Sequence, residues 1–181
     1  MTIARQRRVK AHVMDADAVR RSLFRIAHEI VERNRGAADL VVVGVISKGD
    51  VLAGRLAAKL TELEGIQVTA GAVDTSGHRD DHRPRLPGRS SDVPDITDQT
   101  VVLVDDVIHH GRTARAAMEA LLEFGRPRAI QLAVLVDRGH RQVPIRPDYV
   151  GKNVPTSEES ELVEVCLQEV EGIDAVVILA R

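Results

Sequence analysis

Residues 101–113 read Val-Val-Leu-Val-Asp-Asp-Val-Ile-His-His-Gly-Arg-Thr, and this stretch decides the fold. Its four opening β-forming residues end at two adjacent carboxylates, Asp105 and Asp106, and a helix-forming segment, 112–124, follows Gly111. An apolar run of this kind is typical of a parallel strand that is buried on both faces. Ligands of parallel sheets bind beyond the carboxyl ends of the strands, so we expect a binding site in the turn that carries the two carboxylates.

This turn offers two kinds of binding group. The carboxylates of Asp105 and Asp106 can accept hydrogen bonds from vicinal hydroxyls or hold a hydrated Mg²⁺. The backbone amides of residues 110–113 open a helix, where free N–H groups and the helix dipole favour a phosphate. Together these groups predict a ribose-5-phosphate site. The alternative is a solvated turn in which an aspartate only caps the helix.

The segment resembles the phosphoribosyl-pyrophosphate (PRPP) signature of the type I phosphoribosyltransferases, an acidic pair with Gly-Arg-Thr in register. The resemblance implies that Asp105 and Asp106 are catalytic, bind the ribose hydroxyls and hold, indirectly, the Mg²⁺ that accompanies PRPP. It implies that the phosphate contacts the following loop, His109, His110, Gly111, Arg112 and Thr113. The family usually has a threonine immediately before the glycine, whereas this chain has His110. A protonated imidazole replaces the hydroxyl donor better than a neutral one.

Two further segments resemble parts of the same family's site. Ser47-Lys48-Gly49 follows a predicted strand and is similar to the loop that receives pyrophosphate; taken alone, it is an ordinary turn. Arg79-Asp80-Asp81 is similar to the mobile loop that closes over PRPP, which implies that Arg79 meets the pyrophosphate and that closure keeps water out. The preceding Ser76-Gly77-His78 departs from the family's apolar-plus-tyrosine pair, and a solvated charged loop is the alternative.

The rest of the chain predicts alternating helices and strands in a single domain, 15–181, after a basic N-terminal tail, 1–14, that is either mobile or an edge strand. We expect helices at 15–34, 51–63 and 112–124, strands at 40–45, 67–73 and 129–136, and a flexible polar flap at about 74–98. Short β segments are expected at 148–150, 162–170 and 175–179. This order predicts an α/β fold, a parallel sheet flanked by helices with a small β-rich C-terminal annex.

Composition excludes several classes of protein. A length of 181 residues and a formal charge of −2 fit one domain that is no polycation. The single Cys166 excludes an intramolecular disulfide and a multi-cysteine zinc site. The chain has no run of eighteen apolar residues and no apolar signal core, so we expect a cytoplasmic protein without a membrane partner.

A larger resemblance covers nearly the whole chain. It includes Arg20–Glu29, Asp137–Arg141, Pro144–Arg146 and Gly151–Ser157, and it is to the pyrimidine operon regulatory proteins that double as uracil phosphoribosyltransferases. The resemblance implies a type I phosphoribosyltransferase fold. It also implies that uracil and PRPP give UMP and pyrophosphate, and that a stem-loop of the pyrimidine operon mRNA binds when UMP or UTP is bound. Uracil is expected against Val136, Asp137 and Arg138.

The basic residues themselves predict a local RNA-binding surface. Arg21, Arg25 and His28 share one face of the first predicted helix, opposite its apolar stripe. A second group follows later in the chain: His140, Arg141, Arg146 and Lys152. A basic helical face is more often only solvated, and Phe24 stands where the family often has a small hydroxyl residue.

We therefore expect a uridine-nucleotide-sensing RNA-binding attenuator whose uracil phosphoribosyltransferase activity is weakened by His110, assembled as a homodimer or a higher homo-oligomer. Two alternatives stay open. One is a salvage phosphoribosyltransferase without RNA binding. The other is a regulator whose site only senses nucleotide.

Overall fold

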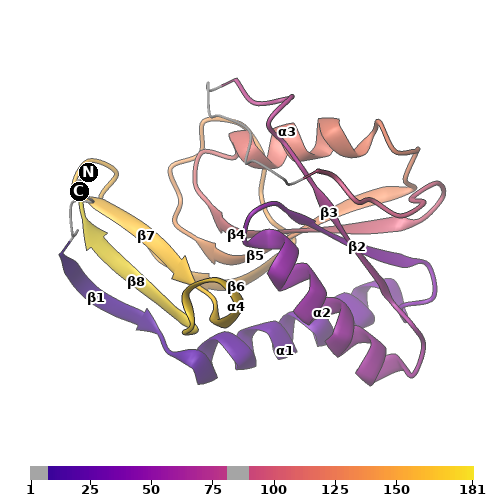
Figure 1. Cartoon of the computed structure of the whole chain (residues 1–181), viewed down its shortest axis with the longest axis horizontal. Coiled ribbons are helices and arrows are strands. Elements are labelled where there is room, and N and C mark those ends of the chain that lie inside the picture. The colour runs from indigo at the N-terminus through magenta and orange to yellow at the C-terminus, as the bar shows by residue number, and fades with distance from the viewer. Residues whose placement is uncertain (1–7, 81–89) are drawn as a thin grey trace.

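A computed structural model describes residues 8–80 and 90–181, which form a five-stranded and a three-stranded sheet (Figure 1). The larger sheet is parallel and has the strand order β3-β2-β4-β5-β6. Its strands are β2 (Leu40–Val45), β3 (Thr69–Val73), β4 (Thr100–Ile108), β5 (Ala129–Asp137) and β6 (Tyr149–Asn153). The central strands β2 and β4 are almost wholly buried, as their Val-rich sequences predict.

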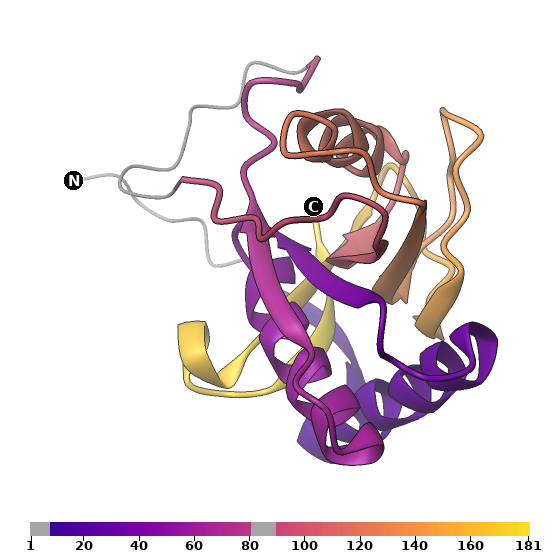
Figure 2. The same cartoon turned by 90° about the vertical axis from the view of Figure 1, so that its right-hand side faces the viewer.

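Helices cover both faces of this sheet (Figure 2). On one face lie α1 (Ala16–Asn34) and α2 (Gly49–Glu64), and on the other lies α3 (Arg112–Leu121). Each face has its own apolar core, with Leu52 and Leu56 of α2 fully buried in one and Leu121 of α3 in the other. Each such side chain contributes about 1.5–3 kcal/mol through burial.

The first helix begins and ends where its sequence predicts. The Asp15 carboxylate accepts a hydrogen bond from the Ala18 amide at 2.7 Å and so caps the N-terminus. Arg35 ends the helix in the left-handed conformation, with a φ of 57°. The five apolar positions expected on one face are its buried residues, Val19, Leu23, Ile26, Ala27 and Ile30.

The smaller sheet is antiparallel and lies at one end of the molecule (Figure 1). Its order is β1-β8-β7, formed by Val9–Met14, Ala175–Ala180 and Glu161–Cys166. The N-terminal segment therefore supplies an edge strand. The β-rich annex is thus built from both ends of the described chain, not from its C-terminal part alone.

Several details of the expected elements are wrong. The strand expected at 162–170 ends at Cys166, and a short helix, α4 (Gln168–Glu171), follows it. The segment expected at 148–150 belongs to β6, which pairs with β5 in the parallel sheet rather than with the annex. The helix expected to reach residue 124 ends at Leu121. Of the expected flap, residues 81–89 lie outside the described part of the chain.

Candidate nucleotide-binding site

The acidic pair lies inside β4 and not in a turn after it, which corrects the expectation from sequence. β4 continues to Ile108 because its pairing with β5 continues, with Asp105 opposite Val134 and Val107 opposite Val136. Asp105 is 8% exposed, so it is a buried carboxylate, and Asp106 is half-buried. The pair therefore lies on a largely buried strand and not on an exposed loop.

Burial dominates the electrostatics of this pair. Desolvation, followed by the charge of Asp106, raises the pKa of Asp105 well above its ordinary value. Desolvation also raises the pKa of Asp106. Backbone amides stabilise both carboxylates: the Asp106 amide donates to Asp105 Oδ1 at 2.9 Å, and the Val107 amide donates to Asp106 Oδ1 at 2.8 Å. Carboxylates in such surroundings favour a ligand that brings hydroxyl donors or a cation.

A cavity of about 170 Å³ opens above Asp105. It is lined by Arg79, Asp105, Val107, Ile108 and the loop from His109 to Ala114. The loop residues expected to bind phosphate, His109, His110, Gly111, Arg112 and Thr113, all border it. The structure thus brings Asp105, Arg79 and the predicted phosphate loop to one cavity, whereas Asp106 does not line it.

Gly111 is required by the geometry of this loop. It has a φ of 88° and precedes α3, whose first amides therefore face the cavity end of the helix. A Cβ on Gly111 would lie 2.8 Å from Val143 Cγ2, so a side chain would also collide with the segment after β5. That segment supports the loop, because the amides of Gln142 and Val143 donate to the His110 carbonyl at 3.0 and 3.2 Å.

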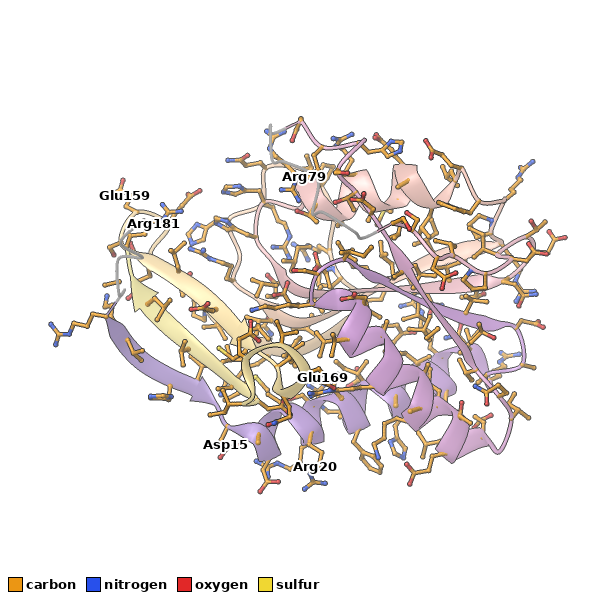
Figure 3. The ribbon with its side chains drawn as sticks, viewed as in Figure 1. Asp15, Arg20, Arg79, Glu159, Glu169 and Arg181 are labelled. Carbon is orange, nitrogen blue, oxygen red and sulfur yellow. The ribbon has the colours of Figure 1, made fainter. Side chains whose placement is uncertain are left out.

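The segment before the undescribed residues is held on α3. Arg79 donates to the Thr113 hydroxyl at 3.1 Å, and Figure 3 shows Arg79 next to this helix. Asp80 forms an ion pair with Arg112, which also donates to Gln142 at 2.9 Å. Asp81 lies outside the described residues. Arg79 is therefore within reach of a ligand in the cavity, as the family resemblance implies.

The second predicted loop is adjacent to β4, but its lysine points elsewhere. A Cβ on Gly49 would lie 2.4 Å from the Val104 carbonyl oxygen, so the start of α2 packs directly against β4. Lys48 donates to the Val165 carbonyl and forms an ion pair with Glu171 at 2.8 Å. Ser47 is exposed. Lys48 thus joins the loop to the smaller sheet in this conformation.

The expected uracil segment forms the end of β5 and is tightly bound. Val136 is fully buried, and Asp137 accepts from the Gly139 amide at 2.9 Å and from Arg141 at 2.6 Å. Arg138 is 5% exposed and donates to the Thr156 hydroxyl at 3.1 Å and to the Glu161 carbonyl at 3.2 Å. Burial lowers the pKa of Arg138.

Comparison with known proteins identifies the family. The family model for the phosphoribosyl transferase domain matches residues 13–169. The chain belongs to this family. It is 54% identical to the Bifunctional protein PyrR of Pelotomaculum thermopropionicum over 95% of this chain and 97% of that one. It is also 54% identical to the Bifunctional protein PyrR of Deinococcus deserti, over 92% and 93% of the two chains. The chain is therefore a member of the PyrR family.

Solved structures show the same fold. The hypoxanthine phosphoribosyltransferase of Trypanosoma cruzi aligns with a TM-score of 0.73 at 18% identity, over 95% of this chain and 97% of that one. A hypoxanthine-guanine phosphoribosyltransferase from Bacillus anthracis aligns with a TM-score of 0.70 at 22% identity, over 95% and 99%. The expected type I phosphoribosyltransferase fold is thus confirmed, and enzymes of this fold generally use Mg²⁺ with PRPP.

The structure places the basic residues of this PyrR-family chain in different surroundings. Arg141 is turned inward, since it donates to the carbonyls of His109 and Ile145, both at 2.8 Å, as well as to Asp137. It holds the phosphate loop, and its contact with RNA stays a prediction. His140 lies beside the same loop and bonds to the Thr156 carbonyl at 2.7 Å.

Other basic residues remain on the surface and lie on neighbouring elements. Arg25 donates to the carbonyls of Val150 and Gly151 at 2.9 and 2.8 Å, which places α1 against β6 and near Lys152. Lys152 donates to the Val13 carbonyl at 3.2 Å. Arg21, His28 and Arg146 are exposed, and Arg21 borders an open hollow of about 530 Å³ between β1 and α1.

Several functional contacts could not be found from sequence. Glu158 bonds to His110 at 2.8 Å, yet the two residues are 48 positions apart. Thr156 and Val143 likewise approach the site only through the tertiary fold. Of these residues only Thr156 belongs to a segment that carried the family resemblance. Among the described residues, no helix is both long and apolar enough to span a bilayer.

Proposed function

We propose that this chain transfers the phosphoribosyl group of PRPP to uracil, giving UMP and pyrophosphate, and that it regulates pyrimidine genes by binding their mRNA. The observation that carries the first part is the buried acidic pair of β4 followed by the glycine loop at the start of α3. This arrangement supports a ribose-5-phosphate site, in a fold that phosphoribosyltransferases share.

The proposed reaction needs positioning and charge stabilisation but no protein nucleophile. Pyrophosphate leaves C1 of the ribose, positive charge develops on the ring, and a ring nitrogen of uracil attacks C1 and loses its proton. Asp105 and Asp106 hold the ribose hydroxyls, and the amides of residues 110–113 hold the 5′-phosphate. Arg79 stabilises the leaving pyrophosphate, and Val136–Arg138 border uracil.

The donor set suits Mg²⁺. Two desolvated carboxylates with raised pKa values supply oxygen ligands, which is the chemistry that Mg²⁺ prefers. Asp105 and Asp106 would hold, indirectly, the Mg²⁺ that accompanies PRPP, and this ion would supply positive charge to the leaving pyrophosphate. Lys48 reaches the pyrophosphate in this proposal only after it leaves Glu171.

The regulatory half rests on the PyrR relatives, whose name calls them bifunctional, and on the exposed cations of α1 and β6. Arg21, Arg25, His28 and Lys152 lie on these two adjacent elements, with Arg146 in the loop before β6. We propose that they contact the phosphates of an mRNA stem-loop in the cytoplasm, and that UMP or UTP favours this binding.

An assay with radiolabelled uracil, PRPP and Mg²⁺ tests the enzymatic half. The wild-type chain is expected to form UMP, and Arg79→Ala is expected to lower kcat/KM by about 100-fold or more, as for removal of one transition-state donor. Arg126→Ala, on an exposed residue after α3, is the matched control and should leave the rate unchanged. UMP binding without any UMP formation would instead identify a regulator whose site only senses nucleotide.

A further inference from the structure

Histidine rings and a carboxylate gather beside the phosphate loop, and the proposed reaction does not use them. His110 Nε2 lies 2.8 Å from Glu158 Oε1, and His109 Nε2 lies 3.9 Å from the same oxygen. The His109 and His110 rings are stacked, with centroids 3.7 Å apart. The three ligand atoms all lie within 4.8 Å of one another. Such a grouping has the composition of a metal site.

The ring of His109 gives independent support. Its Nε2 atom is buried and has no hydrogen-bond partner among the described residues. A buried nitrogen left in this state costs about 1–3 kcal/mol, so some ligand is expected there. Burial, followed by the charge of Arg138, lowers the pKa of His109 to about 4. The imidazole is therefore neutral at pH 7, which is the form that binds metals.

The ring of His140 lies beside Glu158 and His109. Its Nε2–H donates to the Thr156 carbonyl at 2.7 Å, which leaves the lone pair on Nδ1. Nδ1 lies 3.8 Å from Glu158 Oε2, and the ring makes an edge contact with His109. A backbone carbonyl that fixes the tautomer of a histidine is the usual companion of a metal ligand.

We propose that His109, His110 and Glu158 bind one divalent transition-metal ion such as Zn²⁺. Imidazole and carboxylate ligands suit Zn²⁺, Ni²⁺ or Co²⁺, whereas Mg²⁺ prefers oxygen ligands. Tetrahedral Zn²⁺ with bonds of about 2.1 Å separates neighbouring ligand atoms by about 3.4 Å, between the 2.8 and 3.9 Å found here. Small side-chain shifts would admit the ion, and water would complete its coordination.

The ion would join two distant parts of the chain. His109 and His110 precede Gly111 in the phosphate loop, whereas Glu158 follows β6 and leads into β7. A metal bound between them would fix the loop to the smaller sheet without occupying the acidic pair. The Glu158 carboxylate supplies negative charge that offsets the repulsion from buried Arg138.

Calorimetric titration of ZnCl₂ into the untagged, chelator-treated full chain tests the site. One ion per chain is expected, with Co²⁺ giving the strong visible absorption of a tetrahedral complex. His110→Ala and Glu158→Gln should each weaken Zn²⁺ binding at least about tenfold. Glu159→Gln is the matched control, because Glu159 projects from the same segment at the outer end of the smaller sheet (Figure 3).

A thermal scan distinguishes loss of the site from loss of the fold. Zn²⁺ should raise the Tm of the wild type and of Glu159→Gln but not that of Glu158→Gln, since only a folded-state ligand stabilises. Without metal, the three proteins should melt alike. Zn²⁺ affinity that is unchanged in both His110→Ala and Glu158→Gln, or no binding to the wild type, would overturn the proposal whether or not uracil is converted.

Discussion

At the scale of single residues, Asp105 shows how the site is held ready for a ligand. It is buried beside a second carboxylate on the central strand. Burial, followed by the negative charge of Asp106, opposes the ionisation of Asp105. An unfavourable buried charge lowers stability, so a protein retains a carboxylate of this kind only where its function requires it. In the proposed function, the ribose hydroxyls and Mg²⁺ supply the interactions that the unliganded site lacks.

A test at this scale is the stability of Asp105→Asn. The folded-state pKa of Asp105 is raised, so its contribution to stability is present below the unfolded pKa of about 3.9 and is lost as pH rises through the folded value. Asparagine carries no charge and can still accept the Asp106 amide. Urea unfolding without ligand should find Asp105→Asn more stable than the wild type at pH 7, with the difference shrinking toward pH 4. A variant less stable at pH 7 would contradict this explanation.

His110 marks the limit of prediction for single residues. The sequence indicates that an imidazole replaces a hydroxyl donor before Gly111, and this suggested a direct contact with phosphate. In the structure its Nε2 bonds to Glu158. No local pattern predicts that contact, because Glu158 approaches only when the segment after β6 packs against the loop. The identity of the loop was predictable, but the direction of the ring was not.

At the scale of elements, β4 was predicted in the right place but too short. Aspartate is uncommon in strands, so two in succession suggested that the strand ends there. The ladder with β5 continues for three residues beyond Asp105, because Val107 and Ile108 can still pair and pack. Tertiary pairing therefore outweighs local propensity. The buried helix face of α1 and the apolar strands were predictable because periodicity alone determines which side faces the core.

Cations join the small sheet to the rest of the molecule. Arg55 of α2 bonds to Glu169 in α4 and, at 2.8–2.9 Å, to Asp174 between α4 and β8. Hydrogen bonds from Arg55 lower the pKa of both carboxyl groups. Lys48 and Arg138 make similar links from the edge of the nucleotide site. The position of the small sheet is therefore coupled to the loops that would bind PRPP.

Replacing Arg55 tests this link. Arg55→Met keeps most of the apolar stem but leaves Asp174 unpaired, and we expect a loss of about 1–2 kcal/mol at pH 7. Depressed carboxyl pKa values contribute stability above the unfolded values, near 4, and lose it as pH falls through the folded ones. The difference in Tm between wild type and variant should therefore shrink as the pH falls below about 4. Arg20→Met, on an exposed α1 residue, is the control and should melt as the wild type does. A deficit of equal size at pH 3 and pH 7 would rule out the ion pairs as its cause.

At the scale of the whole molecule, the nucleotide site and the proposed RNA surface lie on different parts of the fold. The first uses the carboxyl ends of β4 and β5, whereas the second uses α1 and β6. The pairing of β5 with β6 provides a direct connection between the two sites. The sequence predicted both groups of residues, but it could not separate Arg141, which holds the phosphate loop, from the cations that remain exposed.

Charge reversal separates these two roles. Arg21→Glu should weaken binding of a purine-rich stem-loop and reduce the salt dependence of that binding, while UMP affinity stays unchanged. Arg141→Glu should weaken UMP binding, because the new carboxylate would face Asp137 and release the loop. Gel-shift titrations at several salt concentrations, with and without UMP, provide the measurement. Salt-independent RNA binding, or Arg141→Glu with normal UMP affinity, would contradict the assignment.

The most direct test of the central claim is a calorimetric titration of UMP, and of PRPP with Mg²⁺, into the wild type and Asp106→Asn. If the acidic pair of β4 is the ribose site, the wild type binds both ligands and the variant binds each at least about tenfold more weakly, the equivalent of one lost charge-assisted hydrogen bond. The variant should remain folded, as judged by its thermal melt. Equal affinities for UMP and PRPP in the two proteins would show that the pair is not the ribose site.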